Sequence, residues 1–259
     1  MNLYQAVVLS IVEGVTEFLP VSSTGHMILA GKIMGLSQTG FTSSFEIFIQ
    51  LGAILAIVAL YSRKVIQNYD TLIRVGFAFV PTAIVGLVLY TFIKSYLLTN
   101  PWIVVWSLFL GGIALILLEI FLKRRIAVFT SIDQMPKKYA LIIGLSQSLS
   151  VIPGISRAAA TIIGGQLTGL SRQSAVEFSF LLALPTMISA TGLDLIQSDF
   201  TSFTTHEFIL MGTGFFVAFL VAFGTVKVFM AYTKHYTFIP FGIYRICIAI
   251  LYASIVLAK

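Results

Sequence analysis

Long runs of apolar residues separated by short polar stretches dominate this sequence. Six of the runs are long enough to cross a bilayer, since a spanning helix needs about 20 predominantly apolar residues. Their expected limits are residues 45–62, 75–93, 102–122, 174–196, 208–226 and 239–257. The pattern therefore predicts an all-α polytopic membrane protein.

Two regions interrupt the apolar pattern with polar side chains. The first, residues 13–26, holds two carboxylates, two serines, two threonines and a histidine. Such groups are costly at membrane depth, so their presence indicates a functional site by default. The second, residues 153–157, contains a proline, a serine and an arginine in a similarly apolar setting. We expect the two polar regions to meet and to form one site.

Each polar region is also expected to break a helix. Pro20 removes a backbone donor and disfavours helix at the residue before it. The apolar segments on either side, residues 1–12 and 26–36, are each too short to span. Irregular backbone at membrane depth is tolerated only where it is buried in protein or lines a wet cavity. We therefore predict one re-entrant helical hairpin at the N-terminus and a second one over residues 139–172.

The composition supports a membrane class for the whole chain. Of its 259 residues, 58% are hydrophobic and 10% are charged, against about 45–50% and about 25% in soluble domains. The sequence predicts one membrane domain over residues 1–259, with no room for a separate soluble domain. Cys247, the lone cysteine, lies in an apolar run and is expected to be buried as a small hydrophobe.

Most of the net charge of +6 falls in short loops, where it sets orientation and does not indicate nucleic-acid binding. The basic groups lie within residues 63–74, within residues 123–138, and at Lys227, Lys234 and Arg245. The positive-inside rule places these three groups on the cytoplasmic side. Cytoplasmic and outer loops alternate along the chain only if both hairpins return to the side they entered. This arrangement puts the N- and C-termini outside.

The same order of elements predicts an internal repeat. Residues 1–122 and 139–259 each contain one hairpin and three spans, and because three is odd the second half is inverted. Residues 20–23 are echoed by 153–156, and residues 45–48 by 176–179. Inverted repeats with interrupted helices place a site near the midplane, where the halves meet.

The first polar region carries candidates for acid–base and nucleophilic chemistry. Glu13 and Glu17 are four residues apart and share one face of a helix. Such a pair suits proton transfer, or a hard cation such as Mg²⁺ or Ca²⁺. His26 follows Ser23 by three residues, so the two could pair as nucleophile and base, or His26 could itself be the nucleophile.

The second polar region carries an anion-binding candidate. Arg157, buried in a membrane, needs an anion, which could be Glu13, Glu17 or a bidentately bound phosphate. Helices starting near Ser22 and Ser156 would aim free amides and positive dipole ends at the same place. These features together predict an oxyanion or phosphate pocket.

A transporter or flippase is the competing interpretation, because inverted repeats with broken helices are typical of transporters. Clustered serines, a histidine and paired glutamates around an arginine favour bond cleavage over binding alone.

Both polar regions resemble motifs of a known family. Residues 13–26, EGVTEFLPVSSTGH, resemble the first motif of the bacterial undecaprenyl-diphosphatases, the bacitracin-resistance proteins. Residues 153–161, PGISRAAAT, resemble their second motif, with Ala158 where the family usually has serine. Length, span pattern and motif spacing agree along essentially the whole chain.

The resemblance implies a multi-pass phosphatase of the bacterial plasma membrane. It would hydrolyse undecaprenyl diphosphate to undecaprenyl phosphate and inorganic phosphate, which recycles the lipid carrier of cell-wall synthesis. It also implies dependence on a divalent metal, a site that opens outward, and dimers.

The resemblance maps the family's catalytic groups onto Glu13, Glu17, Ser23, His26, Ser156, Arg157 and Thr161. We expect the chemistry from Glu13, Glu17, Ser23, His26 and Arg157, with Glu13 and Glu17 also as metal ligands. Substrate binding is expected from Ser22, Thr24, Gly154, Ser156 and Thr161.

Overall fold

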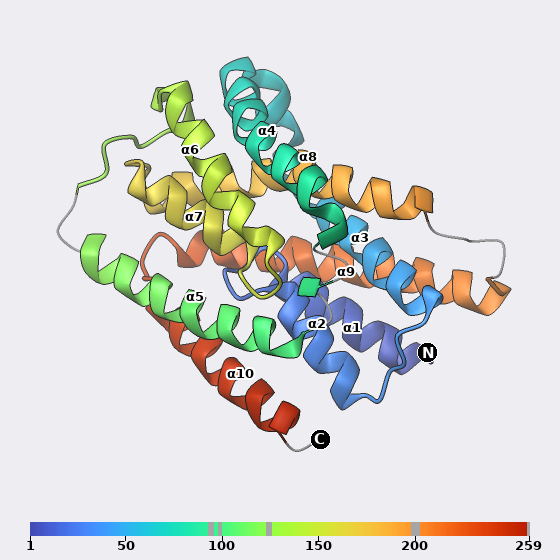
Figure 1. Ribbon diagram of the computed structural model, residues 1–259. Helices are drawn as coiled ribbons and strands as arrows, with labels where there is room; N and C mark the ends of the chain where they lie inside the picture. The colour runs from blue at the N-terminus through green and yellow to red at the C-terminus, as the bar shows by residue number, and fades with distance from the viewer. Residues whose placement is uncertain (93–95, 98–99, 123–125, 198–202, 258–259) are drawn as a thin grey trace.

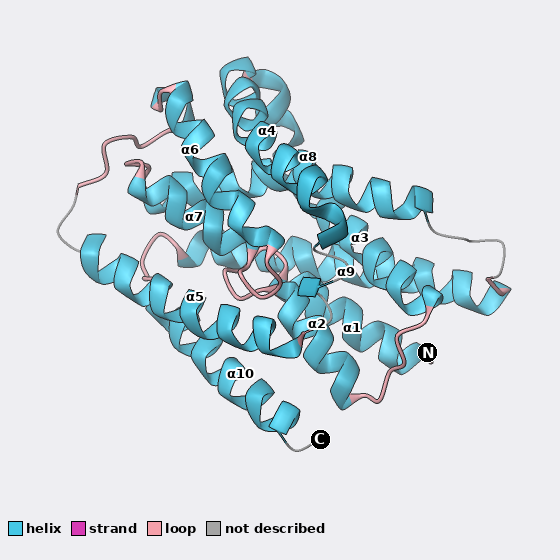
Figure 2. Cartoon of the chain, in the orientation of Figure 1, coloured by secondary structure: helices cyan, strands magenta, loops and turns pink. Residues whose placement is uncertain are grey.

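The computed structural model describes residues 1–92, 96–97, 100–122, 126–197 and 203–257 of the chain. Within these ranges the chain forms ten α-helices, and its one sheet-like pairing is an isolated bridge between Phe129 and Leu170. Figures 1 and 2 show the helices packed around two short loops near the centre of the view. The predicted all-α class is confirmed.

Six of the described helices are long and apolar enough to cross a membrane, and they are the six predicted spans. Ile93, which the prediction included, lies outside the described residues. The spans are α3 (Gly40–Gln67), α4 (Tyr69–Phe92), α5 (Pro101–Leu122), α8 (Arg172–Gln197), α9 (Thr205–Tyr232) and α10 (Ile239–Leu257).

The four shorter helices form the two predicted hairpins, α1 (Leu3–Thr16) with α2 (Ser23–Ile33) and α6 (Lys137–Ser148) with α7 (Arg157–Leu167). Gln5 at the start of α1 donates to the Met34 carbonyl at the end of α2, at 3.3 Å. Phe129, just before α6, contacts the ring of Tyr139 and donates its amide to the Gly169 carbonyl just after α7. Each hairpin therefore begins and ends at the same end of the molecule.

The bases of the two hairpins lie at opposite ends of α3. Phe41, at the start of α3, shares an apolar cluster with Met34 at the base of the first hairpin. Asn68, at the end of α3, donates to Asp133 in the loop that leads into the second hairpin. An inverted repeat requires this arrangement, while a repeat between residues 1–122 and 139–259 stays a prediction.

The basic residues expected in loops gather at one end of the molecule, but Arg63 and Arg74 lie on α3 and α4 and not in a loop, because these two helices extend beyond the apolar runs. Arg74 donates to the carbonyls of Asp133 and Met135, which joins the 63–74 region to the loop before α6. Glu119, near the end of α5, pairs with Arg172 at 2.8 Å and accepts from the Phe238 amide of the α9–α10 turn. The shared side expected from the loop charges therefore agrees with the fold, although residues 123–125 are outside the described part.

The structure changes two sequence expectations about α10. Arg245, expected in or beside the third basic loop and inside the predicted span 239–257, lies well within the helix and is fully buried, because backbone carbonyls of neighbouring segments accept its hydrogen bonds. Cys247 is not buried in the protein but exposed on α10. The apolar residues around it in the sequence indicated a nonpolar environment, and a lipid-facing helix surface satisfies that pattern as well as a protein core does.

Close packing between α4 and α6 depends on a residue without a side chain. A Cβ at Gly144 would lie 2.1 Å from the Ala78 carbonyl oxygen, a backbone atom that cannot move away alone. Gly144→Ala is expected to destabilise the fold by about 1–3 kcal/mol, as overpacking does. The measurement is the midpoint of thermal unfolding in detergent.

Gly76→Ala on α4 is the matched control, because a Cβ there meets nothing within 4 Å. It should leave the midpoint unchanged or raise it, since alanine favours helix over glycine. Equal midpoints for the two variants would contradict this account of the α4–α6 contact.

Candidate active site

The turns of the two hairpins meet around a cavity of about 220 Å³. Its walls combine the polar residues of both regions with side chains from α3 and α8. The predicted site residues that line it are Glu17, Ser22, Ser23, Thr24, Gly154, Ser156 and Arg157. The expectation that the two polar regions meet is therefore confirmed, while their role as one functional site stays a prediction.

Matching serines open the two helices that point at this cavity. Ser22 caps α2 and accepts from the Gly25 amide, and Ser156 caps α7 and accepts from the Ala159 amide at 3.1 Å. Both serines have positive φ, 73° and 31°. Such backbone costs about 1–3 kcal/mol and occurs where function demands it. The strained turns direct the unpaired first-turn amides and positive dipole ends of two helices toward one place.

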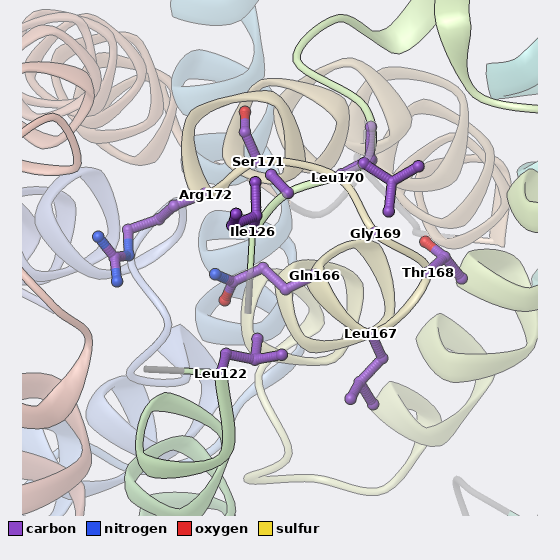
Figure 3. A pocket seen from close by; sticks show the side chains of 11 residues that line it. Leu122, Ile126, Gln166, Leu167, Thr168, Gly169, Leu170, Ser171 and Arg172 are labelled. Carbon is purple, nitrogen blue, oxygen red and sulfur yellow. The ribbon is translucent and has the colours of Figure 1, made fainter. Parts of the chain in front are cut away.

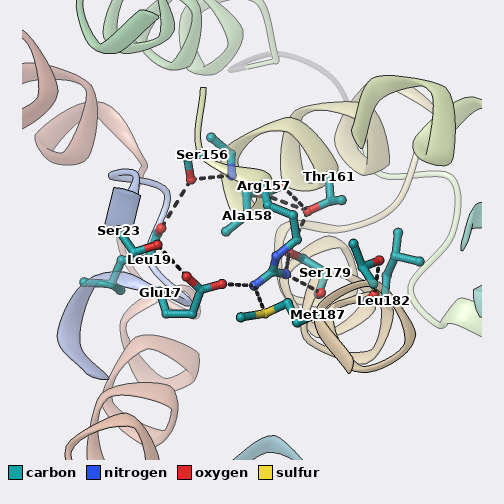
Figure 4. A network of polar contacts seen from close by, with 12 residues as sticks. Glu17, Leu19, Ser23, Ser156, Arg157, Ala158, Thr161, Ser179, Leu182 and Met187 are labelled. Atoms are coloured by element: carbon teal, nitrogen blue, oxygen red, sulfur yellow. Dashed lines mark hydrogen bonds and ion pairs between the residues drawn. The ribbon is translucent and has the colours of Figure 1, made fainter. Parts of the chain in front are cut away.

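A short hydrogen-bonded chain crosses the cavity wall from one hairpin to the other (Figure 4). Ser23 Oγ donates to Glu17 Oε2 at 2.5 Å, and Arg157 Nη2 donates to Glu17 Oε1 at 3.1 Å. Glu17 thus accepts from a serine hydroxyl on one side and a guanidinium on the other. A carboxylate bonded to a hydroxyl in this way can take its proton.

α8 holds Arg157 from behind, as Figure 4 shows. The Ser179 carbonyl accepts from Arg157 Nη1 at 2.8 Å, and Thr161 Oγ1 lies 2.6 Å from the Ser179 hydroxyl oxygen. The guanidinium also lies 5.8 Å from the centroid of the Phe18 ring. Thr161 was expected to contact substrate, but it does not line the cavity. It supports Arg157 through Ser179 instead. The sequence echo included Ser179 without indicating this role.

Glu13 lies behind Glu17, buried on the α1 face that the spacing predicted. Glu17, and Glu46 of α3, are close enough to Glu13 to act on its carboxyl group electrostatically. Oε1 of Glu13 is buried without a hydrogen-bond partner among the described residues. Glu13 is therefore placed to exchange a proton with Glu17 or to bind a cation, rather than to contact substrate from the wall.

The predicted Ser23–His26 pair is wrong. His26 Nδ1 lies 2.7 Å from the Ser22 carbonyl, and Nε2 lies 2.8 Å from the hydroxyl of Tyr244, whose ring stacks on the imidazole. A carbonyl only accepts, so Nδ1 carries the proton, and in the neutral ring Nε2 accepts from Tyr244. One helical turn brings the Nδ1 edge of the imidazole to the backbone of Ser22, not to the Ser23 hydroxyl. His26 therefore does not line the cavity wall. Its partner Tyr244 comes from α10, and nothing near residues 13–26 in the sequence indicated that contact.

A divalent cation fits this site only with help from other ligands. The described residues contain no group of three or more His, Cys, Asp or Glu side chains able to hold a metal. Glu13 and Glu17 together offer one unpaired oxygen and one carboxylate that already bonds Ser23 and Arg157. Mg²⁺ commonly binds through one or two carboxylates plus water and substrate phosphates. The residues present fit a cation that arrives with a phosphate-bearing ligand.

Two further hollows differ in their relation to the polar cavity. A groove of about 500 Å³, lined mainly by apolar residues of α4 and α8, shares Ser150, Thr186 and Ala190 with it. Figure 3 shows the other hollow, of about 330 Å³, lined by Leu122, residues 126–128 and residues 166–172. It contains none of the predicted site residues. The apolar groove is thus the hollow that is continuous with the site.

Known proteins match this chain along nearly its full length. A family model described as "Bacitracin resistance protein BacA" matches residues 6–251. An undecaprenyl-diphosphatase of Aquifex aeolicus (strain VF5) is 48% identical over 254 residues, 98% of each chain. One of Sulfurihydrogenibium sp. (strain YO3AOP1) is 47% identical over 97% of this chain and 98% of its own. One of Persephonella marina is 46% identical over 99% and 100%, respectively.

Proposed function

The chain belongs to the bacitracin resistance protein BacA family, and from that premise we propose how its central cavity hydrolyses undecaprenyl diphosphate. The enzyme is a multi-pass membrane hydrolase that releases undecaprenyl phosphate and inorganic phosphate, which returns the lipid carrier to cell-wall synthesis. The observation that carries the proposed mechanism is the chain from Ser23 through Glu17 to Arg157.

Ser23 is the proposed nucleophile. Its Oγ attacks the terminal phosphorus while Glu17 takes the hydroxyl proton, and the bond from that phosphorus to the bridging oxygen breaks. Undecaprenyl phosphate leaves, and the phosphoryl group stays on Ser23. The 2.5 Å hydrogen bond between Ser23 and Glu17 supports this assignment, as does the engagement of both His26 nitrogens elsewhere.

A water molecule completes the proposed cycle. The proton held by Glu17 leaves with the lipid phosphate, so Glu17 can next deprotonate water for attack on the phosphoserine. The serine oxygen regains a proton as inorganic phosphate departs. Arg157 and the first-turn amides of α2 and α7 face the phosphoryl oxygens and stabilise the charge that develops on them.

Glu13 and Glu17 are the residues that would hold a divalent cation, Mg²⁺ or Ca²⁺, at this site. Such a cation would supply charge neutralisation at the phosphates. The unpaired Oε1 of Glu13 supports this proposal.

The apolar groove between α4 and α8 is proposed to hold the first isoprene units of the substrate. Phe79, Ala83, Leu87 and Leu193 line it, and it joins the polar cavity at Thr186. A diphosphate bound among the helix termini would thus leave its tail in an apolar channel on the lipid-facing side.

We propose that the protein lies in the bacterial plasma membrane, with both termini and the cavity facing outward. We also propose that it forms a homodimer. Intact cells should label a cysteine at Gln38 with an impermeant maleimide, and should leave one at Tyr236 unlabelled until they are lysed, both in a Cys247→Ser background. Both positions are exposed and lie at opposite ends of the fold. The reverse labelling would overturn the orientation.

Phosphate release from a purified sample tests the function and the nucleophile together. Wild-type protein should release phosphate from a polyprenyl diphosphate, and EDTA should stop the release until Mg²⁺ or Ca²⁺ is restored. Ser23→Ala should lower kcat at least about a thousandfold, as loss of a nucleophile does. His26→Ala should lower it less, about ten- to a hundredfold, because His26 orients the Ser22 turn.

Phosphate trapped on Ser23 after a rapid quench with labelled substrate would identify the intermediate directly. A labelled His26, or undiminished turnover by Ser23→Ala, would assign the nucleophile elsewhere. A well-folded wild type that releases no phosphate would sink the hydrolytic proposal itself.

A further inference from the structure

Arg245 of α10 joins three parts of the molecule through backbone carbonyls. It is 0% exposed. Its guanidinium donates to the carbonyls of Pro20 at 3.2 Å and Gly154 at 2.9 Å. It also donates to Ser107 O and Leu108 O of α5, at 3.0 and 3.4 Å. One side chain therefore contacts both hairpin turns and a spanning helix.

The two turn carbonyls occupy equivalent positions. Pro20 lies two residues before Ser22, the cap of α2, and Gly154 lies two residues before Ser156, the cap of α7. Bonds to both carbonyls hold the two helix starts at one separation. Each start carries amides that face the cavity, so this separation decides whether both can address the same phosphoryl group.

Gly111 of α5 lies directly against the Arg245 guanidinium. A Cβ at Gly111 of α5 would lie 2.1 Å from Nη2 and 2.8 Å from Cζ of Arg245. A Cβ at Gly112 would lie 2.6 Å from the Gly242 carbonyl of α10. Gly111 and Gly112 therefore also allow α5 and α10 to pack in contact. Figure 1 shows these helices side by side, in green and red.

A charge in this environment indicates more than packing. Burying a guanidinium is costly unless its donors are satisfied, and an apolar residue of similar volume often stabilises such a position as well or better. The planar fork can serve several carbonyls in fixed directions at once, which neither lysine nor an apolar side chain can do. We propose that Arg245 is a positioning residue, which sets the separation of the two helix starts so that both act on one phosphoryl group.

This proposal rests on the hydrolytic function, so its test includes a readout that does not need activity. Two nitroxide labels report the separation of the turns through the dipolar broadening of the EPR spectrum. They are attached to cysteines that replace Leu19 and Ile152 in a Cys247→Ser background. Arg245→Met should weaken and spread that broadening while the midpoint of thermal unfolding in detergent changes by a few degrees. Unchanged broadening in Arg245→Met would overturn the positioning role even if wild type showed no phosphatase activity.

Kinetics supply the second readout. Arg245→Met and Arg245→Lys should lower kcat about a hundredfold with KM changed less than about threefold, because misaligned charges affect the transition state most. Methylguanidinium should restore part of the kcat of Arg245→Gly. Equal kcat in wild type and Arg245→Met, or a loss that only tracks the folded fraction, would contradict the proposal.

Gly111→Ala provides a variant that keeps the arginine. It should displace the guanidinium and reproduce the kcat loss, whereas Gly212→Ala on α9, where a Cβ meets nothing within 4 Å, should not. In an Arg245→Met background Gly111→Ala should add no further loss, since it acts through Arg245. Full additivity of the two losses would show that Gly111 acts by another route. If Arg245→Met does not fold, the broadening and kcat of Gly111→Ala decide the matter alone.

Discussion

Replacing Glu17 by glutamine is expected to lower kcat for phosphate release by at least about a thousandfold, which approaches the full contribution of a general base. The carboxylate accepts from Ser23 and from Arg157 at once. Glutamine keeps the shape but removes the charge and cannot take the serine proton. It also leaves Arg157 without its counterion at the edge of the cavity. The loss should therefore fall on kcat far more than on KM.

The measurement is steady-state phosphate release with a matched control. Glu207→Gln makes the same chemical change in the first turn of α9. There Glu207 is partly exposed and forms a capping box with Thr204. Glutamine can serve in such a box, so kcat and stability should stay near wild type. Retention of more than a tenth of wild-type kcat by Glu17→Gln would show that another group accepts the serine proton.

Replacing Arg157 by lysine is expected to lower kcat/KM by about a hundredfold or more, despite the conserved charge. The guanidinium reaches Glu17 with Nη2 and the Ser179 carbonyl with Nη1. An ammonium is a point charge without this planar fork, so it can satisfy one of these partners or the substrate phosphate, but not all of them. The loss should appear in both kcat and KM, because Arg157 faces the phosphate before and during transfer.

Arg63→Lys is the control, since Arg63 is exposed near the end of α3 and lines none of the described hollows. Its kinetic constants should match wild type. Inhibition by inorganic phosphate gives an independent readout: the inhibition constant should rise for Arg157→Lys and stay constant for Arg63→Lys. Unchanged phosphate inhibition in Arg157→Lys would remove Arg157 from the phosphate site.

Sequence patterns determined the elements of this protein because each depends on local chemistry. Apolar runs of about 20 residues become helices in a bilayer, since a helix satisfies all its backbone hydrogen bonds within one segment and barrel strands are shorter. Pro20 and the capping serines Ser22 and Ser156 are local signals, and they ended and began helices as expected. Polar groups at membrane depth likewise pointed to Glu13, Glu17, Ser23 and Arg157 as a site.

Tertiary structure alone decided which of these groups meet and what holds them. Helical spacing allowed Ser23 to pair with His26. In the fold, the Ser23 hydroxyl bonds Glu17 instead, and the His26 imidazole bonds the Ser22 carbonyl and Tyr244. The sequence groups Arg245 with the cations in or beside a loop, because a charge near a loop and a buried charge look alike in a sequence. Only the meeting of two turns on α10 supplies the carbonyls that make its burial possible. Contacts between residues more than two hundred positions apart leave no local pattern, so the fold had to reveal them.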